Sequence, residues 1–137
     1  MPSSHFRKIP SIIGILDYLG NVRSILDVGA GYGKYGIILR EHMDIRKGRF
    51  HRKDWLTTID AVEPNNLNIL NPQPYNTIYT EPIQDLLTSI SEYDLIILSD
   101  VIEYIDKDQN IIFCLSRIMN YIILVRPCNS KKKNKWL

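Results

Sequence analysis

Apolar residues recur along this chain with two different spacings. Ile12 and Leu16 lie on one face of a helical pattern that ends at Gly20, and Pro10 fits the first turn of such a helix. Residues 93–98 instead form a nearly continuous apolar run, which is typical of a parallel strand buried on both faces. The pattern therefore predicts helices alternating with buried strands.

The same reading predicts five strands and three further helical segments. The strands are expected at residues 24–28, 56–62, 77–80, 93–98 and 121–125. The helical patterns between them cover residues 35–43, 83–90 and 106–120. Because strands joined by helices form parallel sheets through right-handed crossovers, this order predicts an α/β fold with helices on both faces of a mainly parallel sheet.

Composition narrows the class of protein. The chain has 137 residues, 45% of them hydrophobic and 23% charged, which predicts one globular domain spanning residues 1–137. A net charge of +2 is too small to indicate a nucleic-acid partner. Cys114 and Cys128 lack partners at metal-ligand spacing, so we expect no metal site and a reducing, cytoplasmic setting. No apolar run is long enough to span a membrane, and the N-terminus lacks a signal-peptide core.

A glycine-rich loop follows the first predicted strand and comes directly before a helix. Gly29, Gly31 and Gly33 alternate there with other residues, and such a loop lets the backbone and helix amides approach a polar ligand. The dinucleotide fingerprint requires glycine or alanine at the sixth position, where this chain has Lys34. An NAD-dependent oxidoreductase is therefore disfavoured but stays among the alternatives.

Residues 25–33, Ile-Leu-Asp-Val-Gly-Ala-Gly-Tyr-Gly, resemble the first motif of class I S-adenosylmethionine-dependent methyltransferases. Residues 61–64, Ala-Val-Glu-Pro, resemble the end of that family's second strand. The resemblance implies a Rossmann-like three-layer sandwich with strand order 3-2-1-4-5 and S-adenosylmethionine as the cofactor. It also implies that Glu63 binds the two ribose hydroxyls, a task suited to a carboxylate because each oxygen can accept one of them.

Other residues receive roles from the same resemblance. Asp27 would contact the amino-acid end of the cofactor, Glu81 would lie near the adenine, and Asp100 would face the methyl group. The full set of cofactor-binding candidates is Asp27, Gly29, Ala30, Gly31, Gly33, Glu63, Pro64, Glu81 and Asp100. Asp100 is the one weak catalytic candidate, because a sulfonium methyl is already activated and its transfer needs mainly positioning.

The chain also departs from the family pattern. The family adds an antiparallel hairpin beside the fifth strand, whereas only residues 128–137 follow here, so we expect that hairpin to be missing and the fifth strand to be an open edge. The edge predicts a homodimer or a partner chain. Residues 44–54 are basic but fall opposite the expected cofactor, which favours a solvated loop over a nucleic-acid site.

These observations predict a methyltransferase acting on an unidentified acceptor, most simply a small molecule. One alternative is a non-catalytic or truncated S-adenosylmethionine-binding module that acts with a partner. Cys128 as a cysteine nucleophile of the kind found in RNA cytosine methyltransferases is disfavoured, because those enzymes carry proline and cysteine where this chain has Asp100 and Val101.

Overall fold

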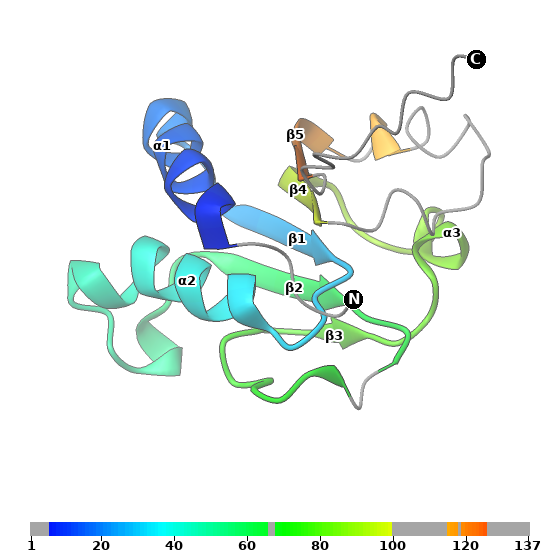
Figure 1. Cartoon of the computed structure of the whole chain (residues 1–137), viewed down its shortest axis with the longest axis horizontal. Coiled ribbons are helices and arrows are strands. Elements are labelled where there is room, and N and C mark those ends of the chain that lie inside the picture. The colour runs from blue at the N-terminus through cyan, green and yellow to red at the C-terminus, as the bar shows by residue number, and fades with distance from the viewer. Residues whose placement is uncertain (1–5, 66–67, 100–114, 118, 126–137) are drawn as a thin grey trace, which may run out of the picture.

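The computed structural model describes residues 6–65, 68–99, 115–117 and 119–125. Five strands form one sheet in the order β3-β2-β1-β4-β5, and every neighbouring pair is parallel (Figure 1). Their bounds are β1 Ser24–Val28, β2 Thr58–Val62, β3 Ile78–Tyr79, β4 Tyr93–Ser99 and β5 Met119–Val125. The predicted fold class and strand order are confirmed.

Helices and short 3-10 turns precede the first strand and connect the later ones. They are η1 Phe6–Lys8, α1 Ile9–Leu19, α2 Lys34–Met43, η2 Ile45–Lys47, η3 Arg52–Asp54 and α3 Ile83–Leu86. Pro10 lies in the first turn of α1, where its missing N–H costs nothing, and Gly20 ends the helix with a φ of 72°. The N–H of Gly20 donates to the carbonyl of Leu16, which satisfies one of the last carbonyls of the helix.

Two hydrophobic cores cover the two faces of the sheet. One joins the sheet to α1 and α2 and includes Leu95 and Ile97, whereas the other joins it to α3 and includes Ile96 and Leu98. Successive side chains of a strand point to opposite faces, so β4 supplies both cores in alternation. This explains the unbroken apolar run from Leu95 to Leu98.

Several predicted boundaries were wrong. β2 begins two residues later than residue 56, because the Leu56 N–H donates to the Asp44 carboxylate, outside the β2 ladder. α3 ends at Leu86 rather than at residue 90, and β3 has two residues. Met119 belongs to β5, opposite Tyr93, although its spacing placed it in the helix of residues 106–120. Most of that helix lies outside the described residues.

The segment between α2 and β2 is less solvated than its charge predicts. Asp44 is fully buried and forms ion pairs with Arg40 and Arg49, so the start of this segment is part of the interior. Its position agrees with the prediction, because it precedes β2 and lies at the tails of the strand arrows in Figure 1, whereas the loop after β1 lies at their heads. Among the described residues, no helix is long and apolar enough to cross a membrane.

Candidate functional site

The loop of residues 29–33, called here the glycine loop, leaves the carboxyl end of β1 and leads into α2. Gly29, Gly31 and Gly33 have φ angles of 76°, 55° and 86°, a left-handed region in which a side chain would be strained. The N–H groups of Gly29 and Ala30 donate to the carbonyl of Val62, at N–O distances of 2.8 and 3.3 Å. The glycine loop is thus anchored against the end of β2.

Glu63 comes directly after β2 and contacts the glycine loop. Its Oε2 accepts the Gly31 N–H at 2.9 Å, while its Oε1 accepts the Asn65 N–H at 3.0 Å and lies 3.4 Å from the Asn68 amide nitrogen. The side chain of Glu63 is buried, and Pro64 follows it in the turn. Glu63 and the glycine loop, both singled out from the sequence, therefore meet at the carboxyl end of the sheet.

Asp27, in β1, is fully buried just before the glycine loop. Its Oδ2 accepts the Tyr75 hydroxyl at 2.7 Å, whereas Oδ1 has no hydrogen-bond partner among the described residues. Burial raises the pKa of Asp27 to about 7; the Tyr75 hydrogen bond lowers it, the negative charge of Glu63 raises it and the positive charge of Lys34 lowers it. Asp27 therefore exchanges its proton near neutral pH.

Tyr75 comes from the connection between β2 and β3 and was missed in the sequence. Its hydroxyl accepts the Gly36 N–H at 3.1 Å, and its ring lies so close to α2 that a Cβ at position 36 would be 2.3 Å from the Tyr75 Cζ. Burial and the adjacent Asp27 raise the pKa of Tyr75, so the hydroxyl keeps its proton at neutral pH. A single tyrosine between two strands gives no sequence signal for this contact.

Ser99, at the end of β4, was also missed. Its buried Oγ has no hydrogen-bond partner among the described residues. Alternation along β1 and β4 places Ser99 and Asp27 on the same face of the sheet, the one covered by α1 and α2. The carboxyl end of the sheet thus holds two buried polar atoms without a hydrogen-bond partner among the described residues.

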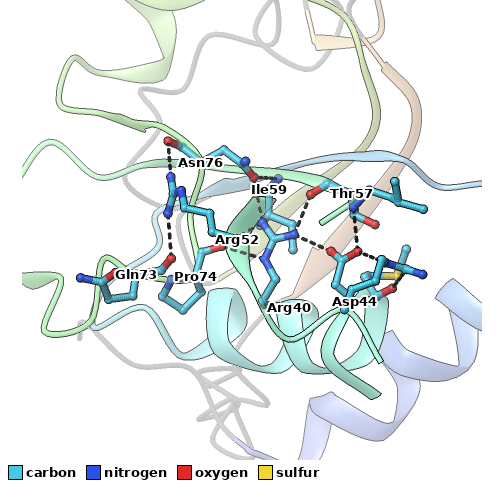
Figure 2. A network of polar contacts seen from close by, with 11 residues as sticks. Arg40, Asp44, Arg52, Thr57, Ile59, Gln73, Pro74 and Asn76 are labelled. Carbon is cyan, nitrogen blue, oxygen red and sulfur yellow. Dashed lines mark hydrogen bonds and ion pairs between the residues drawn. The ribbon is translucent and has the colours of Figure 1, made fainter. Parts of the chain in front are cut away.

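A buried arginine holds the connection that carries Tyr75. Arg40 Nε and Nη2 donate to the carbonyl of Pro74 at 3.0 and 2.9 Å, and Nη2 also donates to the side chain of Asn76 at 2.8 Å (Figure 2). Its Nη1 donates to the carbonyl of Thr57 and to Asp44, and its guanidinium stacks on the Trp55 ring at 3.8 Å.

Arg52 holds the same connection from its exposed side. Its two terminal nitrogens donate to the carbonyls of Gln73 and Asn76, each at 3.2 Å (Figure 2). Arg40, Asp44 and Arg52, with residues 73–76, are called here the arginine network. Because the network bonds backbone carbonyls on both sides of Tyr75, it fixes the position of that residue.

Of the remaining sequence candidates, the structure describes Glu81. Glu81 is exposed in the turn after β3, where its Oε2 accepts the N–H of Thr80 at 3.1 Å. Asp100 and Cys128 lie outside the described residues. In the described part of the chain, no three histidine, cysteine, aspartate or glutamate residues gather as a metal site.

Replacing Asp27 by asparagine is expected to stabilise the ligand-free protein at pH 8. The folded protein holds the Asp27 proton up to about pH 7, whereas the unfolded chain releases it near 3.8, so the wild type loses stability as pH rises through this interval. Asparagine does not titrate, and we expect a gain of about 1–3 kcal/mol at pH 8 that shrinks toward pH 4. Urea unfolding at both pH values measures it; equal gains at both would contradict the assignment.

This chain resembles known proteins in structure rather than in sequence. No protein-family model matches the chain, and no curated protein matches its sequence. The N-terminal domain of EvdMO1, solved with S-adenosylhomocysteine bound, has a TM-score of 0.68 and 13% identity over 88% of this chain and 50% of its own. The bifunctional kinase-methyltransferase WbdD has a TM-score of 0.64 and 17% identity over 90% of this chain and 29% of its own.

The plantazolicin methyltransferase BamL, solved with a triazolic desmethylPZN analogue and S-adenosylhomocysteine, has a TM-score of 0.62 and 16% identity over 82% of this chain and 41% of its own. At these identities the likeness shows the fold. The chain spans between 29% and 50% of the length of these three solved proteins.

Proposed function

We propose that this chain, whose fold is that of the class I S-adenosylmethionine-dependent methyltransferases, binds S-adenosylmethionine at the carboxyl ends of β1, β2 and β4. The observation that carries the proposal is the contact between the Gly31 N–H and the Glu63 carboxylate. It brings a carboxylate and a glycine loop with left-handed backbone together at the carboxyl ends of a parallel sheet, where nucleotide cofactors bind.

The residues fit the cofactor in chemistry as well as in place. Glu63 Oε2 accepts one hydrogen bond within the protein and keeps a lone pair for a ribose hydroxyl, whereas Oε1 accepts two, so the long one from Asn68 has to give way to the second hydroxyl. The unpaired Oδ1 of Asp27 suits the ammonium group of the amino-acid end, because a buried polar atom without a partner is costly until a ligand satisfies it. Pro64, after β2, and Glu81, after β3, complete the proposed site at its rim, and Asp100, outside the described residues, stays a proposed neighbour of the methyl group.

When bound, the cofactor supplies a methyl group on a sulfonium, which is already reactive. The protein's own residues then bind, orient and exclude water: Glu63 and the glycine loop hold the nucleoside, and Asp27 fixes the opposite end. Positioning of this kind accounts for a large part of the rate of a methyl transfer. We propose a small molecule as the acceptor.

Titration calorimetry with S-adenosylmethionine, S-adenosylhomocysteine and NAD tests the proposal. We expect both sulfur nucleosides to bind and NAD to bind much more weakly, in line with Lys34 at the position where dinucleotide sites need glycine or alanine. The oxidoreductase alternative finds no support among the structural neighbours, which are methyltransferases. Binding of NAD alone would overturn the proposal.

We also propose that the edge of the sheet at β5 pairs with a second copy or a partner chain. β5 is the last strand of the five-stranded order, and Tyr121 and Leu124 are 51% and 43% exposed on it. An exposed apolar edge strand favours pairing. Sedimentation at increasing concentration is expected to show dimers, and a protein that stays monomeric at high concentration would contradict self-pairing.

A further inference from the structure

In the hydrogen bond between Tyr75 and Asp27, the tyrosine hydroxyl is the donor. The Tyr75 oxygen accepts the Gly36 N–H at 3.1 Å, so the single hydroxyl proton is left to donate to Asp27 Oδ2 at 2.7 Å. Oδ2 is therefore occupied by the protein itself. Oδ1, fully buried and unpartnered among the described residues, is the oxygen left for a ligand.

Three separate contacts keep Tyr75 in this position. The arginine network binds the carbonyls of Pro74 and Asn76 on either side of it. Its ring packs on Gly36, where any side chain would collide with it, and its hydroxyl accepts the Gly36 N–H and donates to Asp27 Oδ2. The position of Tyr75 is therefore fixed by contacts of its neighbouring backbone, its ring and its hydroxyl.

We infer that Tyr75 is a positioning residue: it fixes the Asp27 carboxylate so that Oδ1 receives the ammonium group of the cofactor's amino-acid end. It thereby favours ligands that carry this group over nucleosides that lack it. This inference rests on the proposed function, because it assumes that a cofactor of that class binds here.

The charges around Asp27 make the inference sensitive to pH. Glu63 after β2 raises the pKa of Asp27, whereas Lys34 at the start of α2 and the Tyr75 hydroxyl lower it. β4 contributes the uncharged Ile97 at the same register, and α1 buries apolar residues in this core, Ile12 and Leu16. Removing the Tyr75 hydroxyl removes a hydrogen bond that lowers the pKa of Asp27. Burial and Glu63 should then raise this pKa further.

The test compares two ligands by calorimetry between pH 5.5 and 7.5. S-Adenosylhomocysteine carries the ammonium group, whereas 5′-methylthioadenosine has the same nucleoside without it. For the wild type we expect affinity for S-adenosylhomocysteine to rise with pH as Asp27 ionises, and affinity for methylthioadenosine to stay flat. In Tyr75→Phe, affinity for S-adenosylhomocysteine at pH 7 should fall at least about tenfold and its pH profile should move to higher pH. Methylthioadenosine should change less than about threefold.

Tyr93→Phe provides a matched control. Tyr93 donates to Asp60 Oδ2 at 2.7 Å, so this variant removes the same kind of buried hydrogen bond at the amino end of β4. It should lose stability and keep the affinity and pH profile of the wild type for both ligands.

The other outcomes overturn either the inference about Tyr75 or the proposed function. Equal weakening of both ligands by Tyr75→Phe, or an unchanged pH profile, would show that Tyr75 only supports the fold and would overturn the inference while the proposed function stands. Failure of the wild type to bind either ligand would remove the proposed function, and the inference with it.

Discussion

Replacing Glu63 by alanine is expected to weaken binding of S-adenosylhomocysteine at least about a hundredfold, since hydrogen bonds to a charged group contribute about 1.5–3 kcal/mol each and two ribose hydroxyls are involved. Glu63→Ala should have a second consequence, which follows from the contacts of Glu63 in the structure. Glu63 also accepts the N–H groups of Gly31 and Asn65, so its loss frees the glycine loop from the turn after β2. We therefore expect a modest fall in stability beside the loss of affinity, measured by calorimetry and by thermal unfolding.

Glu92→Ala is the matched control for this variant. Glu92 is exposed and precedes β4, at the amino ends of the strands, so the same change of charge and size there should leave affinity as it is. Retained affinity in a folded Glu63→Ala protein would remove the ribose assignment. Equal losses in both variants would attribute the effect to net charge rather than to a contact.

Replacing Arg40 by leucine is expected to destabilise the protein by about 3–5 kcal/mol, because breaking a buried ion pair leaves its partner groups without compensation. Arg40 is 3% exposed, and its loss deprives the Asp44 carboxylate and the Pro74 carbonyl of hydrogen bonds. Burial, the largest effect, raises the pKa of Asp44, but the Leu56 N–H and two arginines together hold it below its ordinary value. For a domain of this size the melting temperature should fall by about 10–20 °C.

Arg46→Leu is the control for Arg40→Leu. It tests whether removing an arginine outside the arginine network gives the same loss of stability. Arg46 is half-exposed and lies 3.5 Å from Asp17, a contact of the kind that contributes at most about 1 kcal/mol. Thermal unfolding should thus separate the two variants clearly. A loss below about 1 kcal/mol for Arg40→Leu would show that the arginine network does not hold the connection before β3.

The fold and one half of the candidate site could be predicted because their signals are local. A short apolar run before the glycine loop placed β1, and a nearly continuous apolar run placed β4. Glu63 was assigned from the resemblance of residues 61–64 to the end of the family's second strand, and β2 is the parallel neighbour of β1. Parallel order alone brings such strand ends together. The contact between Gly31 and Glu63 follows from that geometry.

The other half of the site depends on contacts between distant residues. Tyr75 is 48 positions from Asp27, in the proline-rich connection between β2 and β3, and only the folded chain shows that Gly36 leaves room for its ring. Asp44 looked like part of a solvated basic loop, because a sequence does not show that Arg40 and Arg49 fold back onto one carboxylate. Pairing of this kind is decided by packing rather than by periodicity.

A crystal structure with S-adenosylhomocysteine tests the central claim most directly. We expect both ribose hydroxyls within about 2.6–3.2 Å of the Glu63 carboxylate oxygens, with the glycine loop against the same nucleoside. A ligand bound elsewhere on the sheet, or a Glu63 carboxylate that contacts Gly31 and Asn65 while the ribose lies beyond its reach, would contradict the account.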